Sequence, residues 1–439
     1  MSRLNIALAV SLAAIWSKVW PFLVAILFFG LIIFIHEFGH FIFAKAFGVK
    51  VNEFALGMGP TLLKKQGKET LYALHLFPIG GYCAMEGEDE SSEDARAFCN
   101  KKLWQRIIIV AAGATFNIIL GILICTCLVG TEKYVGTPEI LQFHESAVSN
   151  AEGGLQAGDR ILKIDGKHVF SDEDISFLML RNNTGVYDMT VRRGEETVHL
   201  PNVHFAVRTG GNFSYDKTNV ISDLSAKMKR AGLKNGDVIL KVNGETVTDN
   251  ESLSKAIQKD DDRVIDYTVR RGEETLTVEK VKMATVTVFD FILLGKEKNV
   301  GNVLGGGVKY ALSMSRMVYL SLFDLLRGHY GLNELAGPIG TVSVIADMAQ
   351  ESVKSADLTG LFSIMALITI NIGLFNLLPI PALDGGRLFF MLIELVARRP
   401  VPAKYENWIH AAGMVLLLIF MAVVSASDLW KWISGVGFY

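Results

Sequence analysis

Residues 33–41 read IFIHEFGHF, and the interpretation of the whole chain starts from this stretch. His36, Glu37 and His40 interrupt a run that is otherwise apolar from about residue 19 to residue 43. On a helix, His36 and His40 lie one turn apart on one face, so both imidazoles can reach one metal ion. Glu37 lies about 100° further round the helix and can hold a water molecule. Ionisable groups near a bilayer centre cost about 2.5 kcal/mol or more each. The stretch therefore predicts a metal site, and the alternative is a hydrogen-bonded polar cluster between helices.

The composition places this apolar run in a membrane protein. Of the 439 residues, 50% are hydrophobic and 20% are charged, which excludes a disordered chain or an ordinary soluble enzyme. The net charge of −2 gives no reason to expect nucleic acid as a partner. About 20 apolar residues suffice to cross a bilayer as a helix. We predict spans at 19–44, 105–131, 358–397 and 405–428, with an N-terminal apolar extension at 1–18 and a C-terminal tail at 429–439.

Basic residues beside the spans predict the orientation of the chain, because loops rich in lysine and arginine stay in the cytoplasm. Such residues flank the segment 45–104 and the short loop that follows residue 397; they are Lys45, Lys50, Lys101, Lys102, Arg106, Arg398, Arg399 and Lys404. Both segments are therefore predicted to be cytoplasmic. The long segment 132–357 then lies on the other side of the membrane.

An internal repeat organises this long segment. The octapeptide TVRRGEET occurs at 190–197 and again at 268–275, and the Gly-Leu, Gly-Asp and Ile-Leu-Lys motifs before it recur at the same offset. Each copy predicts a strand, a tight turn, a helix and a closing hairpin. We predict tandem domains at 132–211 and 212–290. They resemble PDZ domains, which bind an extended peptide along a sheet edge; the alternative is a pair of structural β-domains.

A third metal ligand is needed, because a catalytic zinc site usually has three protein ligands and one open position. Asp384 is the candidate, since it ends a charge-free run in the sequence NLLPIPALDGG at 376–386. The two prolines stop a regular helix, and such a break is tolerated at membrane depth only where it lines a cavity or is buried in protein. The alternative for Asp384 is a helix cap at the membrane interface.

These motifs together resemble the site-2 protease family of zinc intramembrane metalloproteases, in its RseP-like branch with tandem PDZ domains. The resemblance covers about residues 20–432 and includes FALGMGP at 54–60 and PIGGY at 78–82. It implies a multi-pass α-helical membrane protein with a cytoplasmic membrane-associated β-region at 45–104 and two periplasmic PDZ-like α/β domains. It also implies the inner membrane of a Gram-negative bacterium, with the active site near the cytoplasmic side.

The same resemblance implies an activity. A zinc-dependent endopeptidase of this type cuts the transmembrane segment of a pre-trimmed single-pass membrane protein in regulated intramembrane proteolysis and envelope stress signalling. Anti-sigma factors and remnant signal peptides are the expected substrates. His36, His40 and Asp384 are predicted to hold Zn²⁺, which activates water, with Glu37 as the general base. Asn376 is predicted to hold the substrate backbone or the developing oxyanion, or else to join two helices.

Other segments leave alternatives open. Residues 70–83 resemble the family's β-region, whose free edge can pair with an unwound substrate, or form a plain cytoplasmic hairpin. Within the linker at 291–357, residues 303–326 predict an amphipathic helix on the membrane or an ordinary packing helix. The PDZ-like domains either screen substrates by size or bind a newly exposed C-terminus. His410 lacks ligand spacing, and we predict a surface or packing role for it. Asn117 is a polar residue within a span, which we predict to be a helix-contact residue, with a catalytic role as the alternative.

Two other classes of function are compatible with parts of the sequence. A membrane scaffold that presents PDZ-like grooves would not need the three ligands. A zinc carrier would have further ionisable residues in several spans, and the predicted spans at 105–131 and 405–428 have almost none.

Overall fold

The computed structural model describes residues 3–88, 90, 92–182, 184–210, 214–215, 218–222, 224–259, 263–327 and 337–434. Parts of the predicted extension 1–18, linker 291–357 and tail 429–439 lie outside the described residues. The chain divides into two compact units. The helical unit contains Met1–Glu132 and Val303–Asp428, and the repeat unit contains Lys133–Asn302 with the C-terminal residues.

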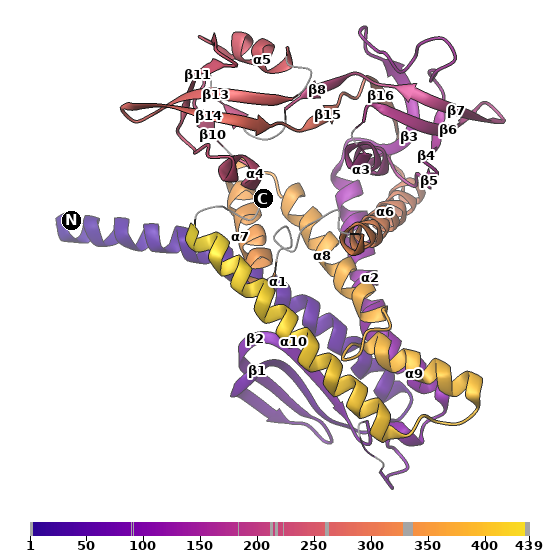
Figure 1. Ribbon diagram of the computed structural model, residues 1–439. Coiled ribbons are helices and arrows are strands. Elements are labelled where there is room, and N and C mark those ends of the chain that lie inside the picture. The colour runs from indigo at the N-terminus through magenta and orange to yellow at the C-terminus, as the bar shows by residue number, and fades with distance from the viewer. Residues whose placement is uncertain are drawn as a thin grey trace. The chain divides into compact units, whose positions relative to one another are not determined.

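Long helices and one hairpin make up the helical unit (Figure 1). Its elements are α1 (Arg3–Ala46), β1 (Val51–Gln66), β2 (Leu71–Met85), the 3-10 helix η1 (Phe98–Asn100), α2 (Leu103–Thr131), α6 (Val300–Leu326), α7 (Pro338–Ser355), α8 (Thr359–Leu377), α9 (Asp384–Ala397) and α10 (Ala403–Ser434).

Four helical segments among the described residues are long and apolar enough to cross a membrane: Val19–Ala46, Leu103–Thr131, Thr359–Leu377 and Lys404–Trp430. They correspond to the four predicted spans. The predicted span 358–397, however, contains two helices, since α8 ends at Leu377 and α9 begins at Asp384. On α10, the side chains of Leu416, Ile419 and Val423 are more than half exposed, as expected of a helix surrounded by lipid.

Small residues bring α2 close to the helices beside it. A Cβ atom on Gly121 would lie 2.3 Å from Cγ1 of Ile370 on α8, and one on Gly307 of α6 would lie 2.2 Å from Oγ1 of Thr126. Close contact through small residues is the usual way in which membrane helices pack. Buried apolar side chains of α2, α6 and α8 form one cluster around Cys125.

The β1–β2 hairpin packs against the C-terminal half of α1, where residues 33–41 lie (Figure 1). Its strands are antiparallel, with register shifts along much of the pairing. Phe54 of β1 contacts Phe34 of α1 edge to face, with ring centroids 6.1 Å apart. A Cβ atom on Gly81 of β2 would lie 3.1 Å from Cγ of Glu37. The glycine thus allows the strand to approach the helix surface next to Glu37.

The repeat unit contains the sequence repeat. Its elements are β3 (Val135–Phe143), β4 (Arg160–Ile164), β5 (Lys167–His168), α3 (Glu173–Asn182), β6 (Val186–Arg193), β7 (Glu196–His204), β8 (Val207–Thr209), β9 (Ser214–Tyr215), β10 (Ile221–Ser222), α4 (Ala226–Arg230), β11 (Val238–Val242), β12 (Glu245–Thr246), α5 (Asn250–Gln258), β13 (Val264–Arg271), β14 (Glu274–Lys282), β15 (Thr285–Thr287) and β16 (Phe291–Lys296).

The two copies of the repeat pair their strands in the same way. The order β4-β6-β7 in the first copy matches β11-β13-β14 in the second, and all of these pairs are antiparallel. In addition, β16, which lies in the predicted linker 291–357, pairs with β3 of the first copy. The strand that follows the second copy therefore completes the sheet of the first.

Candidate metal centre

The two histidines of α1 approach each other through their Nε2 atoms, which lie 3.2 Å apart. His40 is buried, and its Nδ1 donates a hydrogen bond to the carbonyl oxygen of Ile109 on α2 at 2.9 Å. A proton on Nδ1 leaves the lone pair on Nε2, which is the form that binds a metal. As the four-residue spacing predicts, the Nε2 atoms of both histidines lie on the same side of α1.

Asp384 meets the histidines from the other end of the chain. It is the first residue of α9, after the break that follows α8, and a carboxylate is favoured at a helix N-terminus. Its Oδ2 lies 3.1 Å from Nε2 of His36 and 3.3 Å from Nε2 of His40. Among the described residues, His36, His40 and Asp384 form the group able to hold a metal ion.

The spacing of these three atoms fits zinc. Zinc–ligand distances of about 2.0–2.1 Å in a tetrahedral arrangement place the ligand atoms about 3.3 Å from one another. The three separations between these atoms, 3.1, 3.2 and 3.3 Å, agree with this edge length. Two nitrogens and one carboxylate oxygen are also a donor set that zinc accepts. The three residues would thus fit as three protein ligands of a zinc ion.

A cavity of about 730 Å³ opens beside the three ligands. Glu37 lines it together with His36, His40 and Asp384, and residues of β2 and the loop after β2 form other parts of its wall. On this wall, Arg387 of α9 forms an ion pair with Glu88 of that loop. The structure therefore brings four of the five predicted site residues to one cavity.

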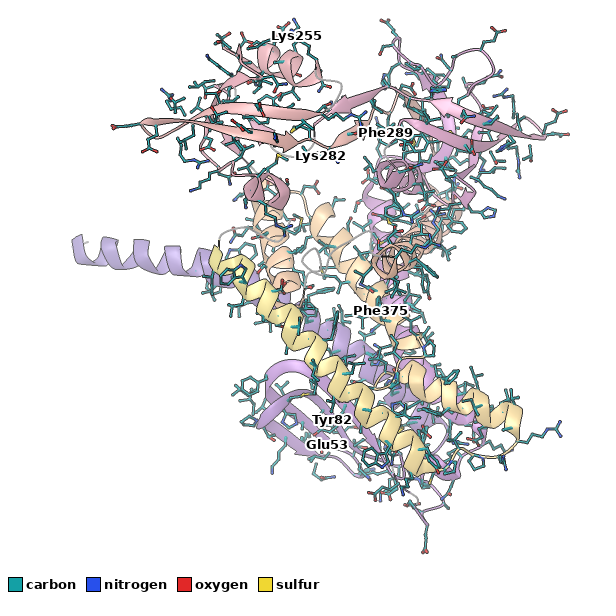
Figure 2. All side chains as sticks on the ribbon, viewed as in Figure 1. Glu53, Tyr82, Lys255, Lys282, Phe289 and Phe375 are labelled. Atoms are coloured by element: carbon teal, nitrogen blue, oxygen red, sulfur yellow. The ribbon has the colours of Figure 1, made fainter. Side chains whose placement is uncertain are left out.

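Asn376 is the fifth predicted residue, and it lies elsewhere. It follows Phe375 near the end of α8 (Figure 2) and is half-buried. It is not among the described residues that line the cavity. Its assignment as a substrate-binding residue stays a prediction.

Asn117 of α2, predicted as a helix-contact residue, is a neighbour of the metal centre, and its contact with His36 was not predicted from the sequence. Its side-chain nitrogen Nδ2 lies 3.3 Å from Nδ1 of His36. One turn earlier on α2, a Cβ atom on Gly113 would lie 2.3 Å from Nε2 of His40. The spacing of Gly113 and Asn117, four residues apart in an apolar helix, was the available signal, because it places both on the face that meets the histidines.

Comparisons with known proteins show which family the chain belongs to. The family model described as "Peptidase family M50" matches residues 24–420. A putative zinc metalloprotease of Clostridium acetobutylicum is 31% identical, covering 92% of this chain and 96% of the relative. The regulator of sigma-W protease RasP of Bacillus subtilis is 28% identical, and the probable protease eep of Enterococcus faecalis is 27% identical; each alignment covers 92% of this chain and 97% of the relative. With a family model that spans most of its length, the chain belongs to peptidase family M50.

Proposed function

We propose that this protein is a zinc-dependent endopeptidase that cuts substrates within the membrane. The observation that carries the proposal is the meeting of Nε2 of His36, Nε2 of His40 and Oδ2 of Asp384 at the wall of a cavity, on helices with the length and composition of membrane spans. Membership in peptidase family M50 and relatives named zinc metalloproteases support it.

Each residue of the centre has a distinct role in this proposal. His36, His40 and Asp384 hold the zinc ion, which when bound acts as a Lewis acid and makes water reactive at neutral pH. Glu37 accepts the proton of the attacking water and donates it to the leaving amine. Its place on the cavity wall beside the ligands supports this role. Asn376 is proposed to bind the substrate backbone, although it lies outside the cavity wall.

The proposed substrates are transmembrane segments of single-pass membrane proteins that have already been trimmed. A helix hides its peptide bonds, so the substrate must be extended before Glu37 can act. Among the described residues, residues 81–85 of β2 pair with β1 along one edge, through residues 51–56, whereas residues 71–74 pair with β1 on both sides. Residues 81–85 also line the cavity. An extended substrate can pair with the other edge of residues 81–85. Anti-sigma factors and remnant signal peptides fit this substrate class, in line with a relative named as a regulator of sigma-W.

The placement in the membrane follows the distribution of basic residues. We propose that the hairpin and the loop before α10 face the cytoplasm and that the repeats lie on the opposite side, in the periplasm of a Gram-negative bacterium. The repeats are proposed to be PDZ-like domains that contact a substrate ectodomain or a peptide. Their matching strand orders support a common domain type.

A substitution at Glu37 tests the proposal. We expect Glu37→Gln to lower the cleavage rate of a single-pass test protein, which carries a signal-peptide helix and no ectodomain, by at least about 100-fold. The bound zinc of the purified protein should not change, because Glu37 is not a ligand. Asp384→Asn should lower both the cleavage rate and the amount of bound zinc. Glu251→Gln, at an exposed position of α5, should change neither quantity. Full activity of the Glu37→Gln protein, or a wild-type protein that binds no zinc, contradicts the proposal.

A further inference from the structure

The loop between α8 and α9 has one backbone donor that pairs with a distant residue. Pro379 and Pro381 have no N–H group. The N–H groups of Leu378, Ile380 and Leu383 donate to carbonyl oxygens within residues 375–380. The N–H of Ala382 donates instead to Nδ1 of His410 on α10, at 3.0 Å. The loop that leads to Asp384 is therefore closed by a side chain of another helix.

The same residue, Ala382, also has an unusual backbone conformation. Its φ angle is +77°, in the left-handed region that residues with a Cβ atom rarely adopt. Such a conformation costs about 1–2 kcal/mol and persists only when the surroundings hold it. Ala382 lies two residues before Asp384, so a change in its backbone angles would move the carboxylate that faces His36 and His40.

The surface of α10 fits the loop closely around this hydrogen bond. A Cβ atom on Gly413, one turn after His410, would lie 2.4 Å from Cβ of Pro381. A Cβ atom on Gly386 of α9 would lie 3.0 Å from Cε1 of His410. Glycines at both positions let the imidazole reach the backbone of Ala382. Because a backbone N–H can only donate, Nδ1 of His410 carries no proton in this arrangement.

We propose that His410 is a positioning residue for the metal centre, because its Nδ1 fixes the left-handed turn at Ala382 and so the place of the Asp384 carboxylate. The proposal rests on the proposed function, since it needs Asp384 to be a zinc ligand. In this scheme His410 is not itself a ligand. It acts through the backbone, as residues that orient a metal ligand commonly do.

Variants that keep or remove the acceptor test this role. Asparagine places Oδ1 where histidine has Nδ1, so His410→Asn keeps an acceptor for the N–H of Ala382. His410→Leu and His410→Phe fill the space without an acceptor. Trp408→Leu, at an exposed position two residues away on α10, controls for the loss of an aromatic ring. Each full-length protein is purified in detergent, and its zinc affinity is measured against a chelator. The absorption spectrum of the Co²⁺-substituted protein reports the ligand geometry.

We expect the leucine and phenylalanine variants to bind zinc about 10–100-fold more weakly and to have an altered Co²⁺ spectrum, whereas His410→Asn and Trp408→Leu stay close to wild type. Wild-type affinity and spectrum in the leucine or phenylalanine variant overturn the inference. If neither of those proteins folds, the zinc affinity of His410→Asn is the deciding measurement. Weak zinc binding by the folded His410→Asn protein overturns the inference, and wild-type affinity supports it. A wild-type protein that binds neither metal refutes the proposed function instead.

Discussion

At the residue scale, the hydrogen bond to His36 depends on how the amide of Asn117 is turned. The Nδ2 atom faces Nδ1 of His36, while the Oδ1 atom of Asn117 is buried without a hydrogen-bond partner. Amide oxygen and nitrogen are exchanged by a half-turn of the group. With the oxygen turned toward His36, it accepts the Nδ1–H proton, and Nε2 keeps its lone pair for the metal. Both imidazoles would then be oriented by acceptors on α2, which are Asn117 and the carbonyl of Ile109.

We therefore predict that Asn117→Leu weakens zinc binding by about 10–100-fold, the usual effect of removing a group that orients a metal ligand. The measurement is competition with a chelator for zinc bound to the purified protein. Thr115→Val is the matched control, because the Thr115 side chain is exposed and bonds only to the carbonyl of Ala111 on its own helix. Equal zinc affinity in both variants contradicts an orienting role for Asn117.

Sequence spacing was sufficient to predict that His36 and His40 lie close together, but it was not sufficient to predict the contacts of Asn117 and His410. His36 and His40 lie on one helix, so their separation along the chain fixes their separation in space. Asp384 stood out because it ends a charge-free run at a helix break. Asn117 and His410 act on residues 81 and 28 positions away, and their roles depend on which helix faces come together. For His410 the sequence shows only the pattern of a packing or surface residue, and for Asn117 the spacing to Gly113 marks a helix face without showing what meets it.

At the element scale, each repeat copy is closed by the same buried ion pair. Arg193 donates two hydrogen bonds of 2.8 Å to Asp159 and one of 3.0 Å to the carbonyl of Gly154. In the second copy, Arg271 binds Asp237 in the same way, with both hydrogen bonds at 2.7 Å. The two aspartates are almost fully buried. Each pair joins the Gly-Asp turn to the end of a central strand, and this explains why both motifs recur together in the sequence repeat.

We predict that Asp159→Asn destabilises the first copy by about 3 kcal/mol, because the substitution leaves a partly buried guanidinium without its carboxylate. Amide hydrogen exchange of β4 and β6 in the full chain measures this loss, and β11 and β13 should keep their protection. Glu251→Gln, which removes an exposed ion pair with Lys255, should cost less than about 0.5 kcal/mol. Equal effects of the two substitutions contradict the assignment.

The turn of the β1–β2 hairpin carries a pH-dependent link to the rest of the helical unit. Hydrogen bonds from Arg96 and Lys45 lower the pKa of Glu69 from 4.5 to about 2. Arg96 lies 2.6 Å from Oε2 of Glu69, and Lys45 is at the end of α1. A lowered pKa in the folded protein stabilises it above about pH 4.5, and this contribution is lost as the pH falls toward 2.

We predict that this link controls cleavage of the hairpin by pepsin, which works in this acidic range. The Glu69→Gln hairpin should be cut faster than wild type at pH 4.5, and the ratio of the two rates should approach one near pH 2, where Glu69 itself becomes protonated. Because pepsin's own activity at a given pH is the same for both proteins, it cancels in the ratio of their cleavage rates. A ratio that is the same at both pH values contradicts the role given to Glu69.

The hairpin also illustrates what element-level patterns can predict. The alternating stretch 70–83 predicted a strand, and β2 covers Leu71–Met85. Its contact with α1 depends on the absence of a side chain at Gly81 and on the aromatic contact between Phe34 and Phe54. Such contacts join segments that are separate in sequence, and periodicity within one segment carries no information on them.

At the scale of the whole molecule, the apolar helices and membership in peptidase family M50 describe an integral membrane protein with a metal centre. The residues proposed as its ligands come from α1 and α9, which lie near opposite ends of the helical unit's sequence. A metal ion bound there would join these two helices, whose side chains His36, His40 and Asp384 already lie within 3.3 Å of one another. Metal binding should therefore be linked to the stability of that unit.

Removing the metal should consequently affect the two units differently. A ligand that binds only the folded state stabilises it by about 4 kcal/mol when its free concentration is 1,000 times its Kd. We predict that a chelator increases hydrogen exchange in α1, α2 and α9 of the full chain and that added zinc reverses the change. The strands of the repeat unit, which contribute no ligand to this centre, should exchange at the same rate with and without metal.

Because His36→Ala removes a ligand, its helices should exchange like those of the chelated protein and should not respond to zinc. An equal response of the repeat strands would show that the metal acts on the chain through residues other than His36, His40 and Asp384.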